Sequence, residues 1–79
     1  MSPTVLRVQG FRFYFFSREE RRFHVHVQHA SGEAKFWLEP QVELAMNYGL
    51  SKSKVKIASK IIADHLDEIK SAWQAHFED

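Results

Sequence analysis

The sequence contains no cysteine, two prolines, three glycines and no long hydrophobic run. Without cysteine the chain can form neither a disulfide nor a thiolate metal site, which are the devices that stabilise many domains of this size. The first residues lack the pattern of a signal peptide, and no apolar run approaches the roughly 20 residues of a membrane-spanning helix. We therefore expect a cytoplasmic protein, not bound to a membrane, that is held together by packing or by a partner.

The composition is that of a folded domain. Hydrophobic residues make up 44% of the 79 residues, and seven Phe and two Trp are among them. A chain of this length supports one hydrophobic core. We expect a single domain over residues 1–79, with a β-rich half over 1–48 and a helical half over 50–78.

The first 16 residues predict a β-hairpin. Thr4–Val8 and Phe11–Phe16 flank Gln9-Gly10, a two-residue connection with glycine where a hairpin turn uses positive φ. The register pairs Val8 with Phe11, Arg7 with Arg12, Leu6 with Phe13 and Val5 with Tyr14. One face then carries the core residues Leu6, Val8, Phe11, Phe13 and Phe15, and the outer face carries Val5, Arg7, Arg12, Tyr14 and Phe16.

A second hairpin is predicted from Phe23–His29 and Glu33–Leu38. A three-residue loop over Ala30-Ser31-Gly32 would bring two imidazoles into the core, whereas a loop with an even number of residues brings valines there. Burying aliphatic side chains costs less than burying imidazoles, so the second register is favoured. The inner face is then Val25, Val27, Ala34, Phe36 and Leu38, and the outer face is His24, His26, Gln28, Glu33, Lys35 and Trp37.

The rest of the chain predicts a short strand and then helix. Val42, Leu44 and Met46 alternate as a possible fifth strand that ends at residues 47–49. Ser51 is a good N-cap, and Leu50 can pack onto Val55. An apolar stripe follows at spacings of three and four: Val55, Ala58, Ile62, Leu66, Ile69, Trp73 and Phe77.

This helical run fits one helix to Phe77 or two that bend near Asp64. No proline or glycine demands a break, so continuity is favoured. The fold class is α+β: a twisted antiparallel sheet of four to five short strands, formed from two N-terminal hairpins, with a C-terminal helix or helix pair packed on one face. Ile57, Ile61 and Ala72 flank the stripe, and they fit either burial or a protein–protein interface.

The net charge of +1 hides an asymmetry. Residues 1–60 contain ten of the eleven Lys and Arg residues and five acidic residues, so this part is basic. Residues 61–79 contain one Lys and five acidic residues, so this part is acidic. Lys52, Lys56 and Lys60 share one line at the start of the helix, where the helix dipole disfavours cations. This line fits either a solubilising face or a site for phosphates or carboxylates.

The outer sheet face is the main candidate binding site. Cations interleaved with aromatic rings can bind single-stranded nucleic acid or an acidic protein segment, and they also occur on ordinary solvated faces. The candidate residues for partner or anion binding are Arg7, Arg12, Tyr14, His24, His26, Lys35, Trp37, Lys52, Lys56 and Lys60.

His24 and His26 are also weak catalytic candidates. They share one strand face with about 7 Å between their Cα atoms, and a histidine titrates near neutral pH. With Arg and Tyr neighbours they could hydrolyse RNA. As metal ligands they lack two partners, since His29 falls on the opposite face, so no metal is expected. No nucleotide-binding or hydrolase motif occurs, and no cofactor is expected.

The segments PTVLRVQGFRFYFFSRE, HVHV, GEAKFWLEP, NYGLS and AWQAHF, in this order, resemble the bacterial domain-of-unknown-function family 4160. The resemblance implies a β-rich N-terminal half and a helical C-terminus. Members are often encoded beside a partner of family 2442, which implies a toxin–antitoxin-like module. It implies no catalytic residues.

The leading hypothesis is therefore a binding module. It would be the toxin-like component of a two-protein system and would dock a cognate small protein, with RNA as a second ligand. Two alternatives stay open. One is a small ribonuclease that uses His24 or His26. The other is a homodimeric regulatory protein that associates through Ile57 and Ile61.

Overall fold

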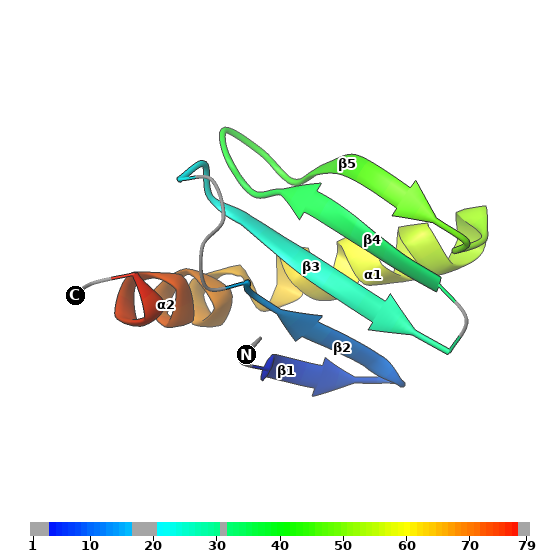
Figure 1. Ribbon diagram of the computed structural model, residues 1–79, viewed down its shortest axis with the longest axis horizontal. Coiled ribbons are helices and arrows are strands. Elements are labelled where there is room, and N and C mark those ends of the chain that lie inside the picture. Colours follow the sequence, from blue (N-terminus) through cyan, green and yellow to red (C-terminus); the bar gives the residue numbers. More distant parts are fainter. Residues whose placement is uncertain (1–3, 17–20, 31, 78–79) are drawn as a thin grey trace.

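The computed structural model describes residues 4–16, 21–30 and 32–77. Five strands form one antiparallel sheet in the order β1-β2-β3-β4-β5, so each strand pairs with its neighbour in the sequence. Two helices follow (Figure 1). The elements are β1 (Thr4–Val8), β2 (Phe11–Tyr14), β3 (His24–His29), β4 (Gly32–Trp37), β5 (Glu43–Tyr48), α1 (Lys52–Asp64) and α2 (Leu66–His76).

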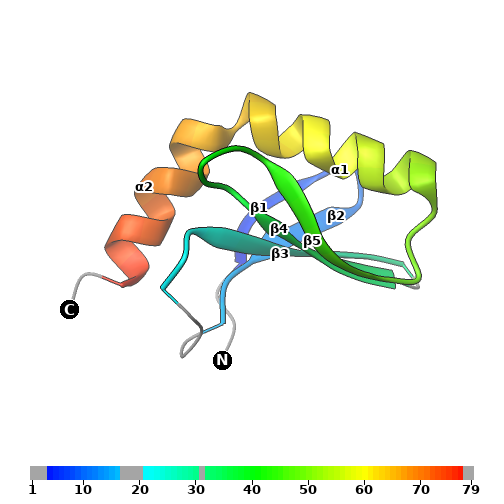
Figure 2. The same cartoon turned by 90° about the horizontal axis from the view of Figure 1, so that it is seen from above.

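The two helices lie on one side of the sheet and leave most of its other face uncovered (Figure 2). α1 runs across the sheet, and α2 turns past the end where β3 begins. The core between helices and sheet contains Phe11 and Phe13 of β2 with Phe15 just after it, the two valines of β3, and three isoleucines of the helices: Ile61, Ile62 and Ile69. The predicted α+β class is confirmed. No helix in the described part of the chain is long and apolar enough to cross a membrane.

The first hairpin forms around the predicted turn. Gln9 and Gly10 both have positive φ, 52° and 83°, as a primed two-residue turn requires. The predicted pairs from Val8–Phe11 to Leu6–Phe13 are confirmed. The predicted pair of Val5 with Tyr14 is wrong, because the register shifts between residues 4 and 6 and Thr4 lies opposite Tyr14. Val5 consequently packs against the core and not on the outer face.

The second hairpin adopts the register that buries valine. His29 pairs with Gly32, which leaves two residues in the connection. Val25 and Val27 are fully buried, and Val27 lies opposite Ala34. The register predicted from the sequence, in which the valines of this strand face the core, is therefore confirmed.

β5 contains an irregularity that the sequence pattern did not predict. Met46 lies opposite Lys35, but Leu44 lies opposite Phe36, so the register shifts by one residue between them. Since neighbouring residues of a strand point to opposite faces, Leu44 lies on the helix side of the sheet and Met46 on the uncovered side. The alternation predicted for these two residues on one face is wrong.

The helical part begins as predicted and then divides. The Ser51 hydroxyl accepts a hydrogen bond from the Lys54 amide at 3.2 Å, and the neighbouring Leu50 is buried. Of the two arrangements considered, the favoured continuous helix is wrong and the pair of helices that bends near Asp64 is confirmed: α1 ends at Asp64, and His65 (φ −117°, ψ 21°) separates it from α2. The bend turns α2 toward the sheet, where Trp73 contacts the rings of Phe15 and Phe23 at centroid distances of 5.3 Å.

The residues flanking the apolar stripe differ in burial. Ile61 is 5% exposed and belongs to the core, whereas Ile57 is 39% exposed. Ala72 packs against the core from α2. The burial interpretation therefore holds for Ile61 and Ala72, and only Ile57 is available on the surface of α1.

Candidate binding face

The uncovered side of the sheet, called here the open face, collects most of the predicted site residues. Cross-strand pairing puts Tyr14 next to His26, His26 next to Lys35, and His24 next to Trp37. In the described chain the open face includes Arg7, Arg12, Tyr14, Phe16, His24, His26, Gln28, Glu33, Lys35, Trp37, Met46 and Tyr48, with the Arg22 side chain lying over Trp37.

His24 lies on the predicted face, yet it has no exposed surface. Its ring packs against Trp37 of β4 at 5.8 Å and Trp73 of α2 at 5.1 Å, and its Nδ1 lies 2.6 Å from the Arg22 carbonyl oxygen. We expected this imidazole to be exposed because a continuous helix, which was favoured over two, would not reach the outer face. In the structure α2 bends around the end of the sheet and covers the imidazole. His24 is therefore a structural residue of this face.

The centre of the open face is a cluster of rings. Tyr14 stacks on His26 at 5.4 Å with an angle of 24°, and Phe16 meets the same imidazole edge-on at 4.6 Å. The Arg12 guanidinium lies 4.5 Å from the centroid of the Tyr14 ring. Tyr14 is buried by these neighbours although no helix covers it.

Trp37 forms the second cluster, between two cations. The Arg22 guanidinium lies 4.2 Å and the Lys35 ammonium 4.4 Å from the indole centroid. Arg22 also donates hydrogen bonds to the Glu39 carbonyl oxygen at 3.0 and 3.3 Å. These contacts hold the cations in defined positions on the open face, which lowers the entropy that a charged ligand would have to remove on binding.

Arg7 and Arg12 lie opposite each other, as predicted. The repulsion between like charges at such a pair is modest. The Arg12 Nε donates a hydrogen bond to the Thr4 hydroxyl at 2.8 Å. This bond, together with the Tyr14 ring, fixes the guanidinium of Arg12 at the β1 side of the open face.

A hollow of about 290 Å³ lies between the ring cluster and β5. Met46 and Tyr48 form its outer wall and are 47% and 63% exposed. The sequence prediction did not include these two residues, because the shift in β5 decides which of its side chains reach the open face. The sequence signal for them was that Met46 and Tyr48 stand two residues apart just before Gly49, so that both side chains fall on one face of a strand. The hollow is lined by Tyr14, Phe16, His26, Glu33, Ala34, Lys35, Met46 and Tyr48.

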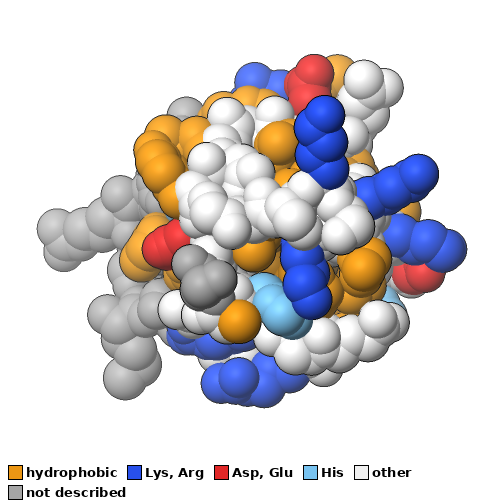
Figure 3. Space-filling view, turned by 90° about the vertical axis from the view of Figure 1, so that its right-hand side faces the viewer, with side chains coloured by type: hydrophobic (Ala, Val, Ile, Leu, Met, Phe, Trp, Pro, Cys, Tyr) orange, Lys and Arg blue, Asp and Glu red, His pale blue; other side chains and the backbone are white. Residues whose placement is uncertain are grey.

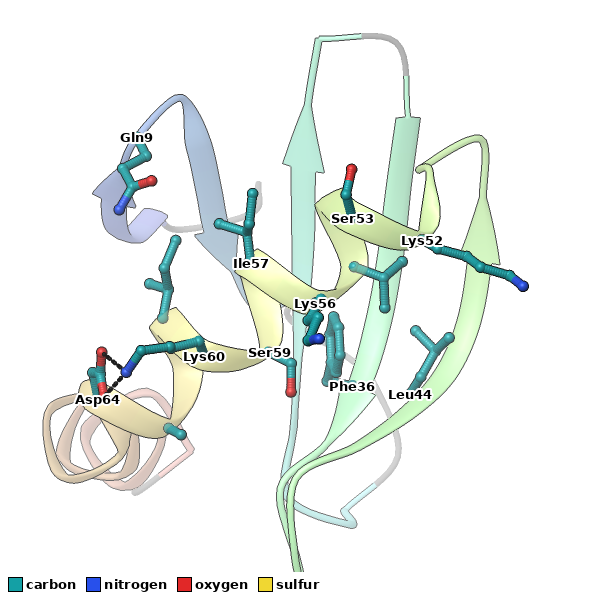
Figure 4. Close-up of a pocket in the computed structure, with 13 residues that line it drawn as sticks. Gln9, Phe36, Leu44, Lys52, Ser53, Lys56, Ile57, Ser59, Lys60 and Asp64 are labelled. Atoms are coloured by element: carbon teal, nitrogen blue, oxygen red, sulfur yellow. Dashed lines mark hydrogen bonds and ion pairs between the residues drawn. The ribbon is translucent and has the colours of Figure 1, made fainter.

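The predicted lysines lie elsewhere. Lys52, Lys56 and Lys60 are exposed on α1, on the opposite side of the sheet from the open face. They border a groove of about 860 Å³ that also contains Leu44 and Ile57 (Figure 4). Lys60 pairs with the Asp64 carboxylate at 3.2 Å. The predicted set of ten binding residues thus divides into two separate surfaces.

The histidines do not form a metal centre in the described residues. No group of three or more His, Asp or Glu side chains in that part of the chain is placed to hold a metal ion. His29 packs against Phe11 on the helix side, with 4.3 Å between the ring centroids, and is separated by the sheet from the other two. The prediction that His29 lies on the opposite face is confirmed.

Comparison with known proteins identifies the family but no characterised relative. Searches among curated proteins and among solved structures gave no significant match. The model of one protein family matches residues 10–74, which include four of the five strands and most of both helices. The chain therefore belongs to the family described as Domain of unknown function (DUF4160).

Proposed function

We propose that this protein is a binding module that docks an acidic segment of a partner protein on its open face. It would act as the toxin-like component of a two-protein module of the toxin–antitoxin type, as the family resemblance implies. The observation that carries the proposal is a sheet face that the helices leave mostly uncovered and that combines ordered cations with exposed apolar side chains.

The shape of the open face suits a protein partner. The hollow beside β5 has the volume to accept one large apolar side chain as an anchor, and Met46 and Tyr48 would contact it. Anchors of this kind supply most of the affinity at protein interfaces. Met adapts its shape to different partners, and Tyr combines a large contact area with a hydrogen-bonding hydroxyl.

The charge of the open face favours acidic side chains around that anchor. Arg12, Arg22 and Lys35 surround the ring clusters. Their positive charge would attract carboxylates and raise the association rate. Glu33 at the rim of the hollow would exclude partners with acidic groups at that point.

Co-expression with the product of the neighbouring gene, followed by size-exclusion chromatography, tests the proposal. We expect one co-eluting complex, and migration of the two proteins apart would refute it. Lys35→Glu should weaken the complex by about tenfold, since it reverses a cation of the open face. Lys70→Glu, the same change at an exposed position of α2, is the matched control and should bind as the wild type does.

RNA is the second candidate ligand of the same face. The exposed rings of Phe16 and Tyr48 could stack with bases while Arg12 and Lys35 contact phosphates. Fluorescence anisotropy with a labelled single-stranded RNA would detect such binding, with a steep loss of affinity as salt is added. Tyr48→Ala should lower the affinity by about tenfold if bases stack there.

The ribonuclease hypothesis now depends on one histidine. His24 has no exposed surface, so a substrate cannot reach it in this conformation. His26 is half-buried at the hollow. Incubation of total RNA with the purified protein, and with His26→Ala as control, tests catalysis; equal inertness of both proteins would contradict it.

The homodimer hypothesis likewise depends on Ile57, because Ile61 belongs to the core. Ile61→Asp would test stability and not association. Light scattering should therefore compare the wild type with Ile57→Asp. An identical monomer mass for both proteins would rule out association through this face of α1.

A further inference from the structure

We propose that the free edge of β5 receives an extended segment of the partner protein as an added strand, which carries apolar and acidic side chains on both of its faces. This inference rests on the proposed function, because it names how the partner is held beside the open face. In this mode of recognition, main-chain hydrogen bonds supply affinity, and the alternate side chains of the added strand supply specificity.

β5 is an edge strand with β4 as its neighbour, and Figure 1 shows no other described element beyond it. Five of its six residues are exposed. Edge strands carry backbone N–H and C=O groups that point away from the sheet, and proteins commonly protect them with lysine or proline. β5 contains neither residue. Its backbone is therefore a suitable template for a further strand.

The opposite edge of the sheet differs. β1 contacts α2, and Val5, Leu6 and Val8 pack against the core. Only Thr4 and Arg7 of this strand are exposed. The two edges of one sheet are therefore unequal, and β5 is the one that is built to accept a neighbour.

Exposed apolar side chains lie on both sides of β5. Leu44, 42% exposed, borders the groove on the helix side together with Ile57, while Met46 and Tyr48 border the hollow on the open face. Side chains of an added strand point alternately to the two faces. One set would therefore contact Leu44 and Ile57, and the other would contact Met46 and Tyr48.

The charges near β5 select an acidic segment. Lys35 lies opposite Met46 on the open face, and Lys52 and Lys56 border the groove on the helix side (Figure 4). Figure 3 shows lysine and arginine side chains standing among exposed hydrophobic ones at the end of the molecule where α1 begins. A second copy of the chain would bring the same lysines to this edge, so charge complementarity favours a different, acidic partner.

Hydrogen–deuterium exchange measured by mass spectrometry tests the inference, on the protein alone and on its complex with the product of the neighbouring gene. We expect the amides of residues 43–48 to exchange about tenfold more slowly in the complex, because the added strand protects them. A complex that forms without this protection overturns the β5 inference and leaves the proposed function standing. Absence of a complex overturns both. Protection that appears in the protein alone and disappears on dilution would assign the edge to a second copy, which also overturns the inference.

A variant with Leu44→Asp and Met46→Asp gives an independent test, because carboxylates on both faces of the edge strand would repel the acidic segment and remove the apolar contacts. Circular dichroism first establishes that the variant is folded. Its affinity for the same partner should fall by about tenfold or more. Gln74→Asp, at an exposed position of α2, is the control and should bind normally. Equal affinities of the edge variant and the wild type would overturn the inference.

Discussion

The two faces of the sheet bury their side chains by different means. On the helix side, Phe13, Val25 and Phe36 are buried under α1 and α2. On the open face, Tyr14 and His24 are buried as well, but by rings and cations of neighbouring strands and by Trp73. Burial on this second face therefore depends on polar and charged groups that a partner could also use. The comparison separates the residues that hold the fold from those that are free to bind.

The largest effect is expected on the helix side. Phe13→Ala removes a fully buried ring from the centre of the core and should lower the free energy of unfolding by about 3–5 kcal/mol. For a domain of this size, such a loss approaches the whole stability. Urea denaturation followed by circular dichroism measures it. A loss below about 1 kcal/mol would mean that the helices do not seal this face.

His24→Leu tests whether the open face has a structural layer of its own. The change removes the 2.6 Å contact with the Arg22 carbonyl oxygen and the ring contacts with Trp37 and Trp73. We expect a loss of about 1–3 kcal/mol, as for a buried polar contact left incomplete. His26→Leu, at the half-buried neighbour, is the comparison in the same denaturation experiment. Equal small effects at both positions would remove the distinction between the two histidines.

Ser51→Ala tests the N-terminal cap of α1, the helix that covers the core side of the sheet. The hydroxyl accepts the Lys54 amide hydrogen bond that caps α1, and its loss should cost about 1 kcal/mol. Thermal unfolding monitored at a helix-sensitive wavelength measures the change. Ser59→Ala, inside α1, lacks a capping role and should leave the melting temperature nearly unchanged; a larger effect there than at Ser51 would contradict the cap.

The smallest effect on stability is expected at the hollow. Tyr48 is 63% exposed, so Tyr48→Ala should change the free energy of unfolding by no more than about 0.5 kcal/mol. The same variant should nevertheless weaken partner binding in the co-elution experiment. A large loss of stability would place Tyr48 with the structural residues and remove it from the proposed interface.

Much of this fold could be predicted because local patterns and global packing agree. Gly10 at a two-residue turn, the valines between the histidines of β3 and the serine before α1 each indicate an element that the structure contains. In each case the signal lies within a few residues of its effect. Register then follows from which side chains are cheaper to bury.

The features that the sequence did not predict, or left open between two alternatives, depend on contacts between distant segments. The register shift in β5 is set by pairing with β4, and the bend at His65 brings Trp73 onto Phe15 and Phe23. No proline or glycine marks either irregularity. The candidate site was affected most, because these two features bury His24 and bring Met46 and Tyr48 to the hollow.

The strand order also bears on how the chain reaches its native state. Every strand of the sheet lies beside the one that precedes it in the sequence, so each pairing closes a short loop, and the entropy lost at each closure is small. Topologies with mostly local contacts have a short conformational search. The sheet can therefore assemble hairpin by hairpin from β1 onward, and the helices then exclude water from one of its sides.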